Sequence, residues 1–369
     1  MRNLAVACAA CAILAPAALA PAAPADPQIG KILRRAEKRA EQLQSLRVTE
    51  QEEIELGAAV SERIRVRYGV VQDASVHKYV ALVGTLLVEG GPRAGLPWHF
   101  IVLDTDGVNA FAAPGGYIHV TRGALGLIRN EAELAAVLAH EIAHVTDKHT
   151  VEAIQKSNAI QIGASETLRD KEVFSRVVDK TAEIVMAGFG RSEELEADRD
   201  ALRRADAIGY APGGLAAFLT RLTERNKEST GKQGLYSSHP EMKERLERLG
   251  KQIAAEHLQA TILLDERYAR HVSYETKPQA DVAAVVDGAA GLTGGEAAPA
   301  PPPKKKGIGL SNLLKPSGSE RKSAEVTGSG ASRGVDTERG AAGGSNPALV
   351  EVQLTAAEVS AFREEGKLK

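Results

Sequence analysis

The stretch from Glu131 to Val145 reads EAELAAVLAHEIAHV and decides how the middle of this 369-residue chain folds. Its large apolar side chains recur every three or four residues, which is the period of an α-helix with one buried face. They are Leu134, Val137, Leu138, Ile142 and Val145. The pattern predicts a strong amphipathic helix packed against a core, and two histidines and a glutamate lie near its end.

The histidines of this helix, His140 and His144, are spaced i and i+4 and therefore project from one face. Both imidazoles can reach a single zinc ion, and Glu141 lies beside that face, where it can serve as general base for a water molecule. A pair of surface or capping histidines is the alternative interpretation. The chain has 9 histidines, so HExxH arises by chance in only about one case in a hundred, which favours the metal site.

A hydrolytic zinc ion usually has three protein ligands and one open position. A third histidine ten residues after His140 is excluded, because position 150 is Thr150 and His149 is one residue out of register. The segment RSEELEAD, residues 191–198, supplies carboxylates instead. Glu194 can complete a site for one Zn²⁺ per chain, and Asp198, one turn later, can accept a hydrogen bond from a ligating imidazole. Alone, this acidic cluster would be interpreted as a solvated helix face.

Composition and the N-terminal residues restrict the partners and the cellular location of the protein. The 46 basic residues are balanced by 48 acidic ones, which argues against a nucleic-acid partner. Residues 1–25 have the layout of a secretory signal peptide cut after Ala25, and both cysteines, Cys8 and Cys11, lie within it. The alternatives are a transmembrane anchor, which the Ala-rich run broken by Pro16 argues against, and lipidation of either cysteine. No later segment is apolar enough to span a bilayer, so we expect an exported, periplasmic protein, with peripheral association with the envelope or the outer membrane left open.

The order of the chain predicts one folded domain over residues 26–275, because 13 of the 14 aromatic residues lie between Tyr68 and Tyr274. Helices are expected at residues 30–46, 50–68, 74–89, 122–129, 131–145, 192–208 and 254–264, with strands at 98–103, 108–112 and 117–121. A flexible Gly/Pro/Ser/Ala-rich linker is expected at 276–348. A short helical segment is expected at 349–369, where Thr355 and Glu358 form a capping box.

Four segments together carry a family resemblance. They are NAFAAPGGYIHVTRGAL at 109–125, HEIAH at 140–144, RSEELEAD at 191–198 and SHP at 238–240. They resemble the gluzincin metallopeptidase family of the CAAX prenyl endopeptidases and HtpX, and within it the soluble periplasmic branch of the β-barrel-assembly-enhancing proteases. The resemblance covers roughly residues 50–250. Neither the spanning helices of the membrane members nor a 34-residue helical repeat is found in the sequence. This argues against prenyl-protein processing and against carrying over the specific clients of the periplasmic members.

This resemblance implies an α+β fold: a mainly helical zincin-type metallopeptidase domain with a small β-sheet whose edge strand borders the active site. It implies His140, His144 and Glu194 as zinc ligands, Glu141 as general base and Asp198 behind the ligands. It also places His239 near the metal, either stabilising the transition state or inhibiting as a fourth ligand; a helix N-cap is the plain alternative for His239.

The strand that begins at Gly115-Gly116-Tyr117 is a candidate for an open edge that pairs with substrate backbone, although an ordinary sheet strand is equally compatible. We therefore expect a zinc endopeptidase acting on unfolded or misfolded proteins. The alternative is a zinc-stabilised chaperone or assembly factor that binds such proteins with little cleavage. The intact Glu141 favours the enzyme, because a binder does not need that base.

Overall fold

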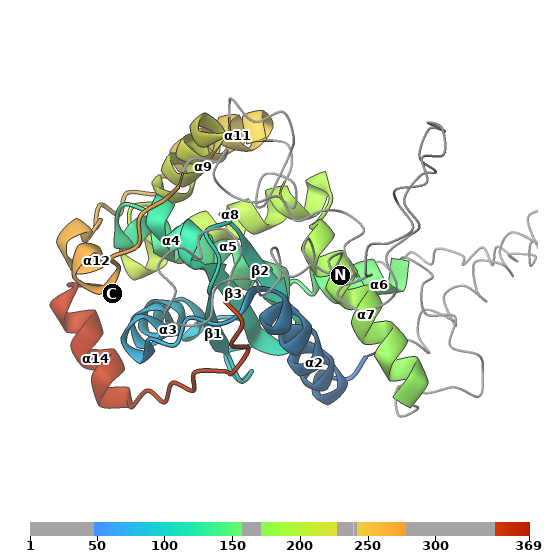
Figure 1. Ribbon diagram of the computed structural model, residues 1–369. Coiled ribbons are helices and arrows are strands. Elements are labelled where there is room, and N and C mark those ends of the chain that lie inside the picture. The colour runs from blue at the N-terminus through green and yellow to red at the C-terminus, as the bar shows by residue number, and fades with distance from the viewer. Residues whose placement is uncertain (1–47, 157–170, 227–238, 240–241, 278–343) are drawn as a thin grey trace, which may run out of the picture. The chain divides into compact units, whose positions relative to one another are not determined.

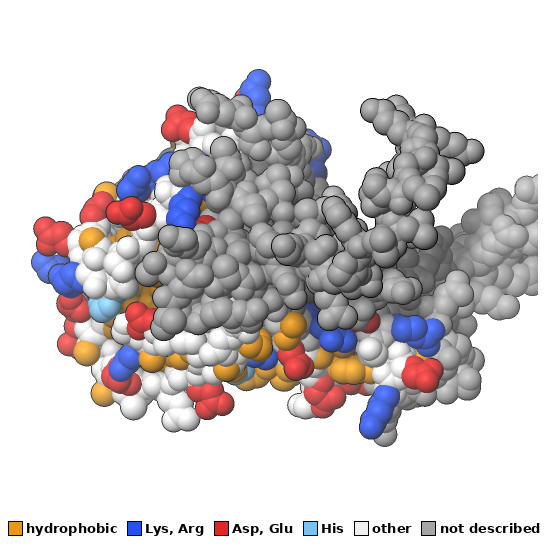
Figure 2. Space-filling model, viewed as in Figure 1, with side chains coloured by type: hydrophobic (Ala, Val, Ile, Leu, Met, Phe, Trp, Pro, Cys, Tyr) orange, Lys and Arg blue, Asp and Glu red, His pale blue; other side chains and the backbone are white. Residues whose placement is uncertain are grey.

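The computed structural model describes residues 48–156, 171–226, 239, 242–277 and 344–369. The expected signal peptide, the helix expected at residues 30–46 and most of the expected linker lie outside the described residues. Within the described residues, no helix combines the length and apolar character that a membrane span requires. Figure 2 shows acidic and basic side chains interspersed over the described part of one face.

A three-stranded sheet lies at the centre of the domain (Figure 1). Its strands are β1 (His99–Leu103), β2 (Ala110–Ala113) and β3 (Tyr117–Thr121). The order is β1-β3-β2, with β3 parallel to β1 and antiparallel to β2. Because β3 is paired on both sides, the expectation that the strand starting at Tyr117 is an open edge is wrong. Hydrophobic pattern alone predicts a strand but not its neighbours.

Both faces of this sheet are covered by helices. On one face, Phe100 and Val102 pack with α3 (Ala74–Val88) and α5 (Glu131–Thr146). On the other face, Ile101 and Leu103 pack with α2 (Glu50–Tyr68) and α7 (Lys171–Ala187). Side chains alternate between the faces of a strand, so burial on both sides requires an unbroken apolar run such as residues 100–103.

The helices that position the site have well-defined ends. Asn130 caps α5 by accepting a hydrogen bond from the backbone of Glu133 at 2.9 Å. Alongside α5 packs α8 (Arg191–Ile208), which ends at Gly209 in the left-handed conformation with φ 107°. Thr49 and Glu52 form the expected capping box at the start of α2. These ends agree with the sequence patterns.

The remaining helices complete the domain. They are α4 (Arg122–Leu127), α6 (His149–Lys156), α9 (Gly214–Arg225), α11 (Met242–Ala255), α12 (Asp265–His271) and α14 (Ala356–Glu365), with a short 3₁₀ turn η1 (Pro114–Gly116). The helix predicted at 254–264 is wrong. Ile262 exchanges backbone hydrogen bonds with Gly209 and Ala211, at 3.2 and 2.9 Å, which holds this segment extended.

The C-terminal residues belong to the same compact unit as the domain. Gly344 donates a backbone hydrogen bond to Tyr68 at 3.0 Å, and Val70 donates one to Asn346 at 2.7 Å, although residues 344–348 were expected to be linker. Further on, α14 has the predicted capping box at Thr355 and packs against α3 (Figure 1). This segment therefore lies along the domain instead of extending from it.

Candidate metal centre

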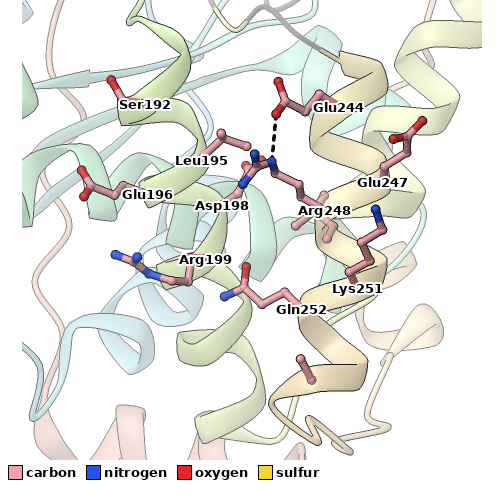
Figure 3. Close-up of a pocket in the computed structure, with 12 residues that line it drawn as sticks. Ser192, Leu195, Glu196, Asp198, Arg199, Glu244, Glu247, Arg248, Lys251 and Gln252 are labelled. Carbon is pink, nitrogen blue, oxygen red and sulfur yellow. Dashed lines mark hydrogen bonds and ion pairs between the residues drawn. The ribbon is translucent and has the colours of Figure 1, made fainter.

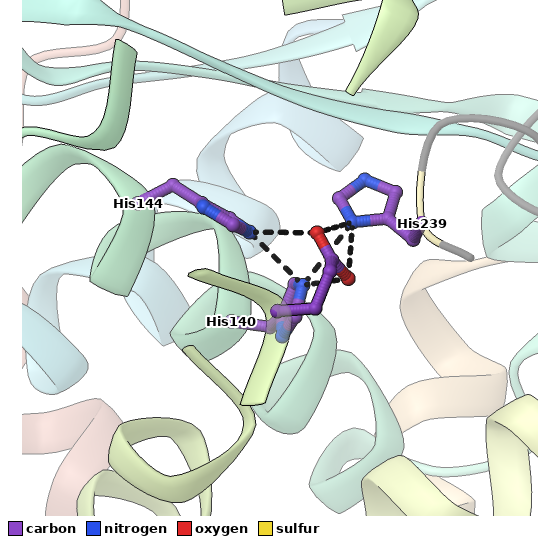
Figure 4. A group of neighbouring side chains, drawn as sticks. His140, His144 and His239 are labelled. Carbon is purple, nitrogen blue, oxygen red and sulfur yellow. Dashed lines mark hydrogen bonds and ion pairs between the residues drawn. The ribbon is translucent and has the colours of Figure 1, made fainter. Parts of the chain in front are cut away.

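Three elements bring four potential ligands together. Helix α5 supplies His140 and His144, α8 supplies Glu194, and His239 lies three residues before the start of α11. All four side chains are buried, and one ligand atom from each lies within 4.8 Å of every other. Figure 4 shows the three imidazoles turned toward a common centre. The structure thus places together the residues that the two sequence segments and the SHP tripeptide singled out.

The separations within this cluster fit a tetrahedral zinc ion. Ligands held 2.0–2.1 Å from zinc at tetrahedral angles are about 3.3 Å apart. The Nε2 atoms of His140 and His144 are 3.2 Å apart, and each lies 3.5 Å from a Glu194 oxygen. The set of two imidazoles and one carboxylate is also one that catalytic zinc uses. The residues present therefore fit the metal that the sequence predicts.

His239 lies close enough to be a fourth member of this set. Its Nδ1 is 3.3 Å from Nε2 of His140 and 2.9 Å from Oε1 of Glu194. Its other ring nitrogen is 3.7 Å from a carboxylate oxygen of Glu141. One imidazole therefore faces both the ligands and the expected base, a position compatible with either role that the sequence left open.

Glu141 lies next to the ligands without being one of them. It is 1 % exposed, and its Oε2 has no hydrogen-bond partner among the described residues. Burial raises the pKa of Glu141, and the neighbouring imidazoles of His239 and His140 oppose that rise. A buried carboxylate oxygen with free acceptor capacity beside a metal-ligand set is suited to hold and deprotonate a water molecule.

Behind the ligands, Asp198 and Arg245 form a buried ion pair. The guanidinium donates two hydrogen bonds to the carboxylate, at 2.8 and 2.6 Å, and its Nη1 lies 2.8 Å from Oε2 of Glu194. Asp198 in turn lies 3.0 Å from Nδ1 of His140. Burial alone would raise the pKa of Asp198, but Arg245 and His140 outweigh it and hold this pKa below its usual value. The aspartate is thus ionised and able to orient His140.

Two residues that sequence reasoning did not assign to the site contact His144. Nδ1 of His149 lies 2.8 Å from Nδ1 of His144, and the ring of Phe189 stacks on the His144 ring at 4.2 Å. The sequence excluded His149 only as a metal ligand. A turn at Lys148, with φ 59°, directs the chain back so that His149 faces the helix it has just left. Only the proximity of His149 to HExxH indicated such a role.

The Gly115–Tyr117 segment does not present an open edge. Gly115 has φ 70°, and its amide donates to Oε1 of Glu53 at 3.2 Å, while Tyr117 stacks on His99 with ring centroids 4.5 Å apart. A Cβ on Gly115 would lie 2.6 Å from Cα of Ile54, so this turn is a close contact with α2. Of the two outer strands, β1 accepts a hydrogen bond from Val71 at Val102, and Asp104, the residue after β1, donates one to Gly69. Strand β2 contacts α5.

A separate hollow of about 680 Å³ lies between α8 and α11. Its lining carries charges of both signs, including Glu196, Arg199, Glu244 and Arg248 (Figure 3). Arg248 donates a hydrogen bond to Glu244 at 2.9 Å across this surface. Asp198 alone, of the residues assigned to the metal centre, is among the lining residues. The hollow is thus behind the ligands and is distinct from the ligand cluster.

Comparison with known proteins agrees with this geometry. Residues 75–253, which include both helices of the cluster, match peptidase family M48. This part of the chain is a peptidase family M48 domain, the class of metallopeptidase that its helix pair and ligand set define. The matched range contains all four segments that carried the resemblance in the sequence.

Particular relatives are similar over part of their length. The β-barrel assembly-enhancing protease of Escherichia coli O157:H7 is 28% identical over 206 residues, covering 53% of this chain and 42% of the relative. The mitochondrial metalloendopeptidase OMA1 of Arabidopsis thaliana is 28% identical over 152 residues, covering 41% and 30%. Metalloprotease YcaL of Escherichia coli K12 is 28% identical over 166 residues, covering 44% and 64%. The chain thus spans less than half of the length of the first two relatives.

Proposed function

We propose that this protein is an exported zinc-dependent endopeptidase that hydrolyses peptide bonds in unfolded or damaged proteins of the cell envelope. The observation that carries the proposal is the convergence of His140, His144 and Glu194 with separations of 3.2 to 3.5 Å, beside a buried Glu141. The relatives named β-barrel assembly-enhancing protease support the envelope as the setting. A periplasmic location and peripheral association with the outer membrane are part of this proposal.

In this mechanism, Glu141 moves the proton. When bound, zinc supplies Lewis-acid polarisation of the scissile carbonyl and lowers the pKa of a coordinated water toward ~7. Glu141 accepts a proton from the attacking water through its unpartnered Oε2 and later donates it to the leaving amine. Asp198 keeps a proton on Nδ1 of His140, so that Nε2 faces the metal.

The outer strand beside the metal-site helix suggests how substrates bind. Strand β2 has a partner on one side only among the described strands and contacts α5. Its residues are at most 2% exposed, so a peptide reaches this strand only when the residues that cover it move aside. An extended peptide can add to such an edge through main-chain hydrogen bonds, which recognise backbone more than side chains. Folded proteins do not offer a free extended backbone, so this binding mode favours unfolded segments.

The test is casein cleavage by wild type and by Glu141→Gln. The substitution keeps the shape of the side chain but removes the basic oxygen, so we expect bound zinc and the fold to be retained and cleavage to be abolished. Zinc is measured by elemental analysis and the fold by circular dichroism. A chelator should abolish the wild-type activity. Cleavage by Glu141→Gln at the wild-type rate contradicts the assignment of the base.

Glu194→Gln is the matched control for Glu141→Gln. It makes the same change, from a carboxylate to an amide, but at a proposed zinc ligand instead of the proposed base. We expect this variant to lose zinc and activity together, unlike Glu141→Gln. Wild type that binds casein and zinc without cutting would instead support the chaperone or assembly-factor alternative.

A further inference from the structure

The two ring nitrogens of His144 face different partners. Nε2 points into the ligand cluster, 3.2 Å from Nε2 of His140 and 3.5 Å from Glu194. An imidazole that ligates a metal through Nε2 carries its proton on Nδ1, and that N–H requires an acceptor when it is buried. His144 is fully buried, and Nδ1 of His149 lies 2.8 Å from its Nδ1.

This distance determines the tautomer of His149. A single proton lies between the two Nδ1 atoms, so if His144 donates, Nδ1 of His149 accepts and its own proton is on Nε2. Nε2 of His149 lies 3.5 Å from Oε2 of Glu196, whose side chain is 53% exposed. The order Glu196, His149, His144 therefore runs from the surface to the ligand cluster, with each N–H directed outward.

The other histidine ligand has a different arrangement. His140 has a carboxylate, that of Asp198, 3.0 Å from its Nδ1. His144 has an imidazole in the equivalent position, and the aromatic ring of Phe189 stacked on its face with an interplanar angle of 16°. His149 is 3% exposed and is the first residue of α6, so the start of this helix holds it in place.

We propose that His149 is a positioning residue that holds the proton of His144 on Nδ1 and thereby presents Nε2 of His144 to the metal. This inference rests on the proposed metal site but not on proteolysis. Glu196 orients His149 in turn, with a smaller effect, because it is half-exposed and 3.5 Å away.

The test compares His149→Asn with His149→Leu. The amide oxygen of asparagine can occupy the position of Nδ1 and accept the hydrogen bond, whereas leucine fills similar volume without an acceptor. We measure the zinc dissociation constant by competition with a chromophoric chelator, and the tautomer of His144 by NMR of the zinc-loaded protein labelled with ¹⁵N-histidine. We expect His149→Leu to weaken zinc binding by about 10- to 100-fold and to alter the His144 signals, since that is typical when such outer partners are lost. His149→Asn should remain close to wild type in both measurements.

Two results would overturn the inference. One is zinc affinity of His149→Leu equal to that of wild type. The other is an equal loss in both variants, which would mean that His149 acts only through packing. Wild type that binds zinc without cleaving casein would refute the proposed function alone, and the ratio of zinc affinities would still decide the role of His149.

Discussion

At the scale of single residues, Arg245 balances the charge of the metal centre. It is 1% exposed and contacts two buried carboxylates, those of Asp198 and Glu194. Carboxylates in such a place are costly unless they are paired and hydrogen-bonded. Arg245 also lies near the backbone of His239, whose carbonyl accepts a hydrogen bond from Nη1 at 3.4 Å. One guanidinium therefore contacts the proposed ligand Glu194 and also Asp198, which is the partner of the ligand His140. The same guanidinium contacts the segment that carries His239.

Replacing Arg245 with methionine should destabilise the protein strongly. The substitution keeps the apolar stem but leaves Asp198 and Glu194 without their cation, a change that typically costs about 3–5 kcal/mol when the pair is buried. The free energy of unfolding in urea measures this loss. Arg248→Met is the matched control on the same helix, because Arg248 is 56% exposed and its ion pair lies at the surface; surface substitutions usually change stability by about 0.5 kcal/mol or less. Equal stabilities of the two variants would contradict the role of Arg245.

The ligands could be predicted from sequence because helical spacing alone places His140 beside His144, and Glu194 beside Asp198. The spacing of residues along a helix does not predict which side chain contacts Nδ1 of His144, because that contact depends on the turn at Lys148. The buried contacts of Arg245 likewise depend on how α11 packs against α8, which local patterns do not encode.

At the scale of elements, the central strand β3 carries a buried polar group. His119 is paired with Ile101 on β1 and Phe111 on β2, and it is completely buried. Its Nε2 lies 2.9 Å from the hydroxyl of Ser61 on α2. Burial lowers the pKa of His119 to about 3, although a hydrogen bond to the Phe111 backbone opposes this. His119 is therefore neutral in the folded protein at neutral pH.

Because His119 stays neutral in the folded protein, the free energy of unfolding should depend on pH. Between about pH 6.5 and 3 the unfolded chain binds a proton at His119 that the folded chain does not, so the free energy of unfolding falls by up to about 1.4 kcal/mol per pH unit as pH falls. Above pH ~6.5 this contribution is constant. Urea unfolding from pH 4 to 7, in chelator to remove metal effects, should show a shallower dependence for Ser61→Ala/His119→Leu than for wild type. Parallel curves would contradict the prediction.

Most helices were predictable because their apolar period and caps are local: Thr49, Asp73 and Thr355 each cap the helix that follows. Strand order was not, because an apolar run does not reveal its neighbours. The error at residues 254–264 has the same origin, since Ile262 is held by backbone hydrogen bonds to residues 209–211 that lie far away in the sequence.

At the scale of the whole described domain, the C-terminal segment connects the two hydrophobic clusters. Leu349 and Val350 pack against the cluster that contains α2, while Val352 and Leu354 pack against the cluster that contains α3 and α5. In the following helix α14, Val359 and Phe362 are buried in the cluster that contains α3 and α5. Sequence alone predicted this helix but assigned it no contact with the metal-site helices.

Phe362 is the residue that ties this segment to α5. Its ring lies under the guanidinium of Arg267 at 3.9 Å, and Arg267 also pairs with Glu131, the first residue of α5. Phe362→Ala should therefore lower the free energy of unfolding by about 3 kcal/mol, through the lost apolar contacts and the lost cation–π contact. Ser360→Ala, on the exposed side of the same helix, should stay close to wild type. Because Phe362 contacts none of the proposed ligands, the folded Phe362→Ala protein should still cleave casein. If Phe362→Ala had the same midpoint of urea unfolding as wild type, α14 would contribute nothing to the stability of the domain.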